Sequence, residues 1–270
     1  MNDSIGFIGG GRMAEALIEG IIKARLVGPE RIMAADPDAG RREVLTGKYG
    51  IKTFPQATDF IGQCTILILA VKPQVMGPVL ESIKAAIHAG HLLISIAAGI
   101  PLSFMEGKLS GCNCHLVRVM PNTPALVQEG ASALSPGHLT TEEDMAKARA
   151  IFDAVGRTVV LAETYLDAVT GLSGSGPAYV FSFIEAMIDG GVKVGLNRAD
   201  AQLLVLQTVL GSVKLAMASN EHPAQLRAMV TSPGGTTIAG LHELARAGFA
   251  GIIMDAVEAA TERSKELGQG

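Results

Sequence analysis

The stretch SIGFIGGGRMAEAL, residues 4–17, decides the fold of the first half of the chain. A short apolar run at residues 4–8 reads as a strand, and a helix is expected to follow the glycines directly. Gly9, Gly11 and Ala14 form the pattern G-x-G-x-x-A at this junction. The first glycine permits a tight turn, the second lets the backbone approach a pyrophosphate, and the alanine lets the helix pack on the strand. The stretch therefore predicts a dinucleotide site at a helix N-terminus.

An acidic residue stands where such a site needs one. Asp36 follows a second β-branched run at residues 31–35 and lies 22 residues beyond Ala14, close to the ~20 typical of the residue that binds the adenosine ribose. Its carboxylate can accept hydrogen bonds from a 2′-hydroxyl and repels a 2′-phosphate, which favours NADH over NADPH. Arg41 and Arg42 follow nearby and could accommodate that phosphate, or could simply belong to an exposed helix start, so both cofactors stay open.

Further runs extend the sheet. Residues 65–71 and 92–96 are continuously apolar, as in strands buried on both faces of a parallel sheet, and two more strands are expected at residues 116–120 and 158–161. This alternation with helical stretches predicts an α/β doubly wound sheet of the Rossmann type. In such sheets ligands bind beyond the carboxyl ends of the strands, so the loops AVKP and AAG, which follow two buried strands, should face the cofactor. Lys72 in the first loop could equally be a solvated charge.

After about residue 163 strand-like runs disappear and helical patterns take over. We therefore expect two domains, a dinucleotide-binding domain at residues 1–163 and an all-α domain at 164–270. Its helices are expected at residues 178–188, 201–219, 237–247 and 251–267. The helix at 201–219 carries apolar residues on nearly every side, so it must be surrounded. The remaining residues of this domain supply few neighbours, which predicts at least a homodimer.

Composition narrows the function. Of 270 residues 48% are hydrophobic and 18% charged, with no Trp and a net charge of −4. No basic stripe is present, so nucleic acid is not expected as a partner. The start shows no signal-peptide pattern and no run resembles a membrane span, so a cytoplasmic protein is expected. Cys112, Cys114 and His115 have no further ligands at workable spacing, and no metal site is predicted.

Several motifs together resemble one family, the pyrroline-5-carboxylate reductases. They are GFIGGGRMAEAL at residues 6–17, LAVKPQ at 69–74, SIAAG at 95–99, MPNTPALVQEGA at 120–131, DAVTGLSGSGPAY at 167–179 and VTSPGGTTIAGL at 230–241. They occur in order along nearly the whole chain. The resemblance implies reduction of 1-pyrroline-5-carboxylate to L-proline with NADPH or NADH, the last step of proline biosynthesis. It also implies a dimer through the helical domain, often built into a ring of dimers.

The resemblance also implies site residues. For the cofactor these are Ile8, Gly9, Gly10, Gly11, Arg12, Met13, Ala70, Val71, Lys72, Pro73, Ser95 and Ala97. For the substrate they are Ser232, Gly234, Gly235 and Thr236, whose loop receives the carboxylate, Thr237, whose hydroxyl contacts the ring nitrogen, and Glu163. Family members often carry Ser near the ribose where this chain has Asp36, and Asn where it has Ala57 and Met229. Asn122 could line the nicotinamide pocket or only shape a turn.

The polar residues near the predicted site suit reduction of an imine better than oxidation of a hydroxy acid. A hydroxy-acid dehydrogenase needs a positioned acid or base, and the turn LSGSGPAYVFSFIEAM is followed by no Lys before Lys193. An imine nitrogen is basic enough to be protonated before hydride arrives, so orientation can carry most of the acceleration. In SPGGTT, successive glycines before a helix start can form an anion nest, and also an ordinary cap. A β-hydroxyacid-dehydrogenase-like oxidoreductase and a non-enzymatic NAD(P)-binding regulator remain alternatives.

Overall fold

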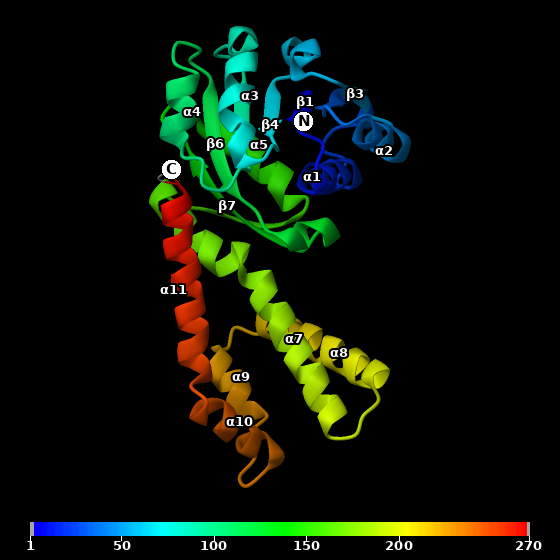
Figure 1. Cartoon of the computed structure of the whole chain (residues 1–270), viewed down its shortest axis with the longest axis vertical. Coiled ribbons are helices and arrows are strands. Elements are labelled where there is room, and N and C mark those ends of the chain that lie inside the picture. The colour runs from blue at the N-terminus through cyan, green and yellow to red at the C-terminus, as the bar shows by residue number, and fades with distance from the viewer. Residues whose placement is uncertain (1–2, 269–270) are drawn as a thin grey trace. The chain divides into compact units, whose positions relative to one another are not determined.

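Eight strands form one sheet in the order β3-β2-β1-β4-β5-β6-β7-β8. Every neighbouring pair is parallel except β6 and β7. The structure is a computed structural model and describes residues 3–268 (Figure 1). The strands are β1 (Ile5–Ile8), β2 (Ile32–Ala35), β3 (Lys52–Phe54), β4 (Ile66–Leu69), β5 (Leu92–Ser95), β6 (His115–Met120), β7 (Gly130–Pro136) and β8 (Gly156–Val160). The predicted doubly wound α/β architecture is confirmed.

Helices cover both faces of this sheet, and the chain after the last strand is helical. The helices interleaved with the strands are α1 (Arg12–Lys23), α2 (Ala39–Tyr49), α3 (Met76–Ile83), α4 (Leu102–Lys108) and α5 (Glu142–Asp153), followed by the short α6 (Leu166–Val169). Those after it are α7 (Gly176–Lys193), α8 (Arg198–Ala218), α9 (Pro223–Met229), α10 (Thr236–Arg246) and α11 (Phe249–Gly268). The second half of the chain is helical, as predicted.

Successive side chains of a strand point to opposite faces of the sheet, and each face has its own hydrophobic core. In β4, Ile66 and Ile68 join the cluster beneath α1 and α5, whereas Leu67 and Leu69 join the cluster beneath α3 and α4. All four side chains are buried, because successive residues of a strand point to opposite faces. Helices α3 and α4 lie side by side over one face (Figure 1). The continuously apolar runs are therefore strands covered on both sides, as the sequence indicates.

Two strands were not predicted. β3 has only three residues, none fully buried, and it lies at one edge of the sheet. β7 has the sequence GASALSP, in which small residues replace the β-branched and large apolar ones typical of strands. It pairs antiparallel with β6 and parallel with β8. Neither segment offers the apolar run on which the sequence-based assignment depends.

Two compact units divide the chain. One contains Met1–Ser175 together with Ala259–Gly270, and the other contains Gly176–Glu258. Within the first unit Leu166 is fully buried and the Ser264 hydroxyl donates to Asp167 Oδ1 at 2.6 Å. These contacts place α6 and the end of α11 together in the first unit. The domain boundary predicted there marks the change from strands to helices and stays a prediction.

Helix α8 departs from the expectation that no stretch resembles a membrane span. By length and composition it could cross a bilayer, with a mean hydropathy of 1.5. Only 11% of its most apolar window is buried within this chain. One such helix is by itself weak evidence for a membrane. What the observation establishes is a long apolar helix that this chain alone leaves uncovered, as its pattern predicts.

Gly20 shows how closely α1 packs on the residues that follow α5. An added Cβ would lie 2.3 Å from Cγ1 of Val155 and 2.9 Å from the carbonyl oxygen of Ala154. We expect Gly20→Ala to lower the free energy of unfolding by about 1–2 kcal/mol, because overpacking outweighs the gain in helix propensity. Gly47→Ala in α2 is the control, since its Cβ would meet nothing within 4 Å, and it should raise stability by up to about 1 kcal/mol. Equal urea midpoints for the two variants would contradict this packing.

Candidate functional site

The glycine-rich turn between β1 and α1 lies in close contact with the backbone at the ends of β2 and β4. Gly9 has a φ of +99°, and its N–H donates to the Ala35 carbonyl at 2.8 Å. A Cβ at Gly9 would lie 2.6 Å from the carbonyl oxygen of Ala70. Only glycine combines this φ with this approach. The first position of the motif therefore does what the sequence predicts, which is to turn the chain in minimal space.

The start of α1 leaves its first N–H groups available. Gly11 is the N-cap residue and provides no side chain to cap them. A Cβ at Gly11 would meet nothing within 4 Å, so the space beside this backbone is open. Arg12 and Met13 form the first turn, and Ala14 is buried against the sheet. A helix N-terminus of this kind combines free N–H groups with a partial positive charge, which suits a pyrophosphate.

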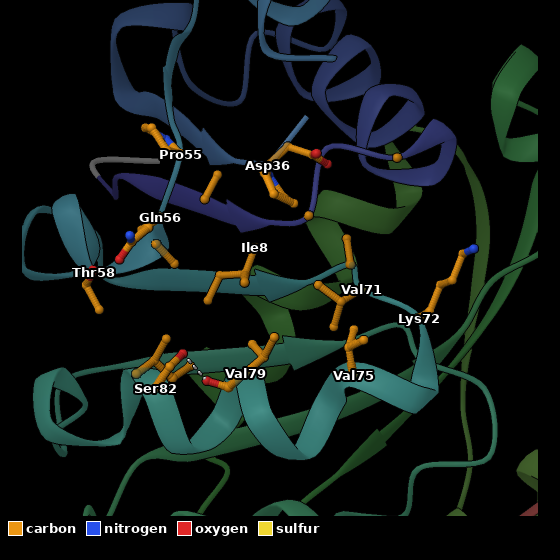
Figure 2. Close-up of a pocket in the computed structure, with 17 residues that line it drawn as sticks. Ile8, Asp36, Pro55, Gln56, Thr58, Val71, Lys72, Val75, Val79 and Ser82 are labelled. Atoms are coloured by element: carbon orange, nitrogen blue, oxygen red, sulfur yellow. Dashed lines mark hydrogen bonds between the residues drawn. The ribbon is translucent and has the colours of Figure 1, made fainter. Parts of the chain in front are cut away.

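A cavity of about 630 Å³ lies at the carboxyl ends of β1, β2 and β4 (Figure 2). Seven of the predicted cofactor residues line it, namely Ile8, Gly9, Gly11, Asp36, Ala70, Val71 and Lys72. This is the crevice where the strand order of a doubly wound sheet reverses, between β1 and β4. The amino group of Lys72 points away from the centre of the cavity (Figure 2). The structure thus gathers these seven predicted residues, from the ends of β1, β2 and β4 and the segments that follow them, around one concave surface.

Most of the rest of the cavity wall is not predicted from the sequence. One part is the segment after β3, with Pro55, Gln56, Ala57 and Thr58. The other is the inner face of α3 and the turn before it, with Val75, Val79, Ser82 and Ile83. The position of Ala57 entered only through the resemblance. A strand at residues 52–54 would have indicated the first part, because its carboxyl end must lie at the same edge of the sheet as Asp36.

Asp36 is held by two backbone donors at the rim of this cavity. Its Oδ2 accepts from the Gly10 N–H at 2.8 Å, and its Oδ1 accepts from the Asp38 N–H at 2.9 Å. Gly10 itself does not line the cavity. The two hydrogen bonds fix the carboxylate between the glycine-rich turn and the turn after β2.

The other predicted cofactor residues lie at neighbouring strand ends. Pro73 begins the short 3-10 helix Pro73–Val75. Ser95 and Ala97 are buried at the end of β5, where the serine hydroxyl accepts from the Ala97 N–H at 3.4 Å. None of these three lines the cavity among the residues that the structure describes. By sheet order they lie on the β4 and β5 side of the crevice, opposite Asp36 on the β2 side.

Asn122 makes structural hydrogen bonds. Its side-chain amide donates to the Ser173 carbonyl at 3.0 Å, and its Oδ1 accepts from the Ala131 N–H at 2.8 Å. Both partners are backbone groups, so this side chain joins the loop after β6 to β7 and to the π-helical turn Thr170–Gly174. The structure favours the turn-shaping alternative for Asn122.

Glu163 also serves the protein's own framework. Its Oε1 accepts from the Leu102 N–H at 2.7 Å and from the Arg118 guanidinium at 2.8 Å. Arg118 is buried, with 9% of its surface exposed, so removing its partner would leave a charge unpaired. Glu163 therefore holds the start of α4 to β6. Its suggested contact with substrate stays a prediction that rests on the resemblance.

Apart from Glu163, the residues predicted to bind the substrate lie in the second unit. The turn Ser232, Pro233, Gly234 and Gly235 connects α9 to α10. Gly234 has a φ of +66°, and the Gly235 N–H donates to the Ser232 carbonyl at 3.1 Å. Gly235 is the N-cap residue of α10 and, like Gly11, offers no side-chain cap. The N–H groups of Thr236 and Thr237 therefore begin a helix whose dipole favours an anion.

The cysteine and histidine cluster is not arranged as a metal site. The Nδ1 of His115 lies 2.6 Å from Asp144 Oδ2, and Asp144 also caps α5 with Thr141. Burial raises the pKa of the Cys114 thiol to about 11. Within residues 3–268 no group of three or more His, Cys, Asp or Glu side chains could hold a metal ion. The structure assigns His115 to packing of α5 against β6.

Comparison with known proteins covers both halves of the chain. The family profile described as pyrroline-5-carboxylate reductase dimerisation matches residues 163–267, and the profile described as NADP oxidoreductase, coenzyme F420-dependent, matches residues 4–99. The chain is similar to the pyrroline-5-carboxylate reductase of Methanosarcina acetivorans, with 49% identity over 99% of both chains. It is 44% identical to that of Arabidopsis thaliana, over 98% of this chain and 95% of the relative.

Solved structures similar to this chain belong to the same family as these relatives. A pyrroline-5-carboxylate reductase from Coxiella burnetii has a TM-score of 0.94 and 33% identity and covers 99% of each chain. The Plasmodium falciparum pyrroline carboxylate reductase with NADP bound has a TM-score of 0.89 and 36% identity over 99% of this chain and 98% of that chain. These likenesses extend over the sheet, the glycine-rich turn and the helices alike. The chain belongs to the pyrroline-5-carboxylate reductase family.

Proposed function

We propose that this chain reduces 1-pyrroline-5-carboxylate to L-proline, with hydride transferred from NAD(P)H to the imine carbon. The observation that carries the proposal is the 49% identity to a curated pyrroline-5-carboxylate reductase along 99% of the chain. That match includes the cofactor turn and the SPGGTT loop together. In the reaction the carbon of the C=N bond gains the hydride, the nitrogen gains a proton, and the nicotinamide is oxidised.

The first unit provides the cofactor site. The turn at Gly9 and Gly11 and the start of α1 would hold the pyrophosphate, and Asp36 would hold the adenosine ribose. By sheet order, the loop with Ser95 and Ala97 would receive the nicotinamide end. NAD(P)H, when bound, supplies the hydride. The role of the protein here is to fix the position of the reduced ring and to keep it from rotating away, which is the entropic part of catalysis.

The second unit provides the substrate loop. The Thr236 N–H would bind the substrate carboxylate at the start of α10, where the helix dipole adds a favourable interaction, and the Gly235 N–H would join it by sharing or exchanging its hydrogen bond to the Ser232 carbonyl. Thr237 is partly buried one position further along the helix, and its hydroxyl would contact the ring nitrogen. No dedicated acid is required, because the imine nitrogen is protonated before hydride arrives. Orientation by the hydroxyl and by the backbone donors then replaces acid–base catalysis.

A substrate panel tests this function. Oxidation of NADH or NADPH, followed by the loss of absorbance of the reduced nicotinamide, should depend on added 1-pyrroline-5-carboxylate and yield proline. Turnover of a 3-hydroxy acid without turnover of 1-pyrroline-5-carboxylate would support the β-hydroxyacid-dehydrogenase alternative. Cofactor binding with neither turnover would support a regulatory protein. The last two outcomes would each overturn the proposal.

The chain forms a homodimer through its helical unit, and a ring of such dimers is the larger assembly that we propose. The supporting observation is the apolar surface of α8, where Leu203 is 68% and Met217 70% exposed. Burial of apolar surface is the main driving force for association, and a second copy of the chain would cover this helix. We also propose a cytoplasmic location, which is compatible with three unpaired cysteines.

Disrupting the apolar surface of α8 should separate the subunits. Leu210 lies near the middle of the helix and is 48% exposed. Leu210→Asp should shift the sedimentation velocity profile from a dimer or larger assembly toward a single 28.0 kDa chain, because a charge would be buried without a partner. Gln207→Asp, which changes a residue that is already polar, should disturb the assembly less. A wild-type chain that sediments as a monomer would contradict the dimer.

A further inference from the structure

We propose that Asp36 makes this enzyme select NADH over NADPH, and that Arg41 and Arg42 are held by the protein so that neither can receive a 2′-phosphate. The inference deepens the proposed function and rests on its cofactor site. It sets this chain apart from the Plasmodium relative whose structure holds NADP.

The carboxylate of Asp36 lies at the rim of the cavity with one donor on each oxygen. Each oxygen of a carboxylate can accept more than one hydrogen bond, so capacity remains for the ribose hydroxyls. A 2′-phosphate would bring negative charge beside this fixed negative charge. Because Gly10 and Asp38 hold the side chain from both sides, it cannot swing away without losing two hydrogen bonds to backbone.

Arg41 is committed to another carboxylate. Its Nε donates to the Gly10 carbonyl at 2.7 Å, and its terminal nitrogen donates to Glu15 Oε2 at 2.8 Å. The hydrogen bond from Arg41 lowers the pKa of Glu15, so this partner stays ionised at neutral pH. Both groups are about three-quarters buried, with side chains 27% and 21% exposed. The Arg41 guanidinium therefore holds the glycine-rich turn through the Gly10 carbonyl.

Arg42 is committed to the turn after β2. One terminal nitrogen donates to the carbonyls of Asp36 at 2.7 Å and of Pro37 at 2.9 Å. These bonds hold the backbone that carries the selecting carboxylate. Neither arginine lines the cavity, and Lys72 is the only cation that does so among the described residues. Lys72 follows β4, with β1 between it and the strand that ends at Asp36.

Direct binding measures the selection. Fluorescence titration of the wild-type protein with each reduced cofactor, in the absence of substrate, should give a dissociation constant at least tenfold lower for NADH than for NADPH. Asp36→Asn keeps the shape of the side chain and one acceptor for Gly10 while removing the charge. It should shift the ratio of the two constants toward NADPH by at least tenfold. Wild-type protein that binds NADPH as tightly as NADH, or an unchanged ratio in Asp36→Asn, would overturn the inference.

The role of the held arginine has its own test. Adding Glu15→Gln to Asp36→Asn weakens the hold on Arg41 and should strengthen NADPH binding a further severalfold. Glu19→Gln in the same background is the matched control, because Glu19 lies one turn further along α1, shares Lys48 with Glu15 and has Lys23 as its other partner, where Glu15 has Arg41. Equal NADPH binding by the two double variants would overturn this part. Substrate turnover is not needed for either readout, so failure of the proposed reaction and failure of the selection are distinguishable.

Discussion

Gly9→Ala should weaken NAD(P)H binding by about a hundredfold or more, and it should also destabilise the first unit. The φ of +99° is unfavourable for alanine, and the new Cβ would lie 2.6 Å from the Ala70 carbonyl oxygen. Strain and overpacking of this kind each cost about 1–3 kcal/mol, so the free variant relaxes its turn, and cofactor binding must then supply the cost of restoring it, with 1.36 kcal/mol corresponding to a factor of ten. Cofactor titration and thermal unfolding together measure both consequences.

Gly11→Ala is the informative comparison for that change. Its Cβ would enter open space and its φ of −64° suits any residue, so the melting temperature should stay close to that of the wild type. Cofactor affinity should nevertheless fall, because the added methyl group occupies the space into which a pyrophosphate must come. If Gly9→Ala binds the cofactor within threefold of the wild type, the turn does not have the role assigned to it.

Thr237→Ala should lower kcat/KM for 1-pyrroline-5-carboxylate by about tenfold to a hundredfold. A lost positioning hydrogen bond costs on the order of 1–3 kcal/mol, which appears directly in the barrier when it orients the reacting bond. The dissociation constant for NADH should not change, because Thr237 lies in the first turn of α10 and does not line the dinucleotide cavity.

Thr237→Ser separates the hydroxyl from the shape of the side chain. It retains the hydroxyl and should recover most of the activity lost in Thr237→Ala. Wild-type kcat/KM in Thr237→Ala would show that the hydroxyl does not contact the reacting centre. Equal losses in both variants would point instead to packing at the start of α10.

The fold could be predicted where side-chain pattern alone decides it. Continuous apolar runs predict β4 and β5, because a strand covered on both faces needs no polar residue, and the run before the glycine-rich motif predicts β1. The small residues of β7 and the three-residue β3 carry no such pattern, and only pairing with neighbours makes them strands. Since β3 was missed, the cavity wall that follows it at residues 55–58 was missed as well.

The parts of the candidate site that depend on motif spacing could be predicted, and the contacts that depend on helix packing could not. Motif spacing placed Gly9, Gly11 and Asp36 correctly at one crevice, since strand ends in a parallel sheet share an edge. Spacing could not show that Arg41 is bound to Glu15, because that pair depends on how α1 and α2 pack. It also could not separate the structural hydrogen bonds of Glu163 from a substrate contact.

The central claim is that hydride moves from the reduced nicotinamide to the imine carbon of 1-pyrroline-5-carboxylate. The most direct measurement uses NADH or NADPH carrying deuterium at the transferable position of the nicotinamide, with the proline product analysed by mass spectrometry and NMR. We predict proline with one deuterium, bound to C5, the former imine carbon. Proline without deuterium, or no proline formed while the reduced cofactor is bound, would contradict the account.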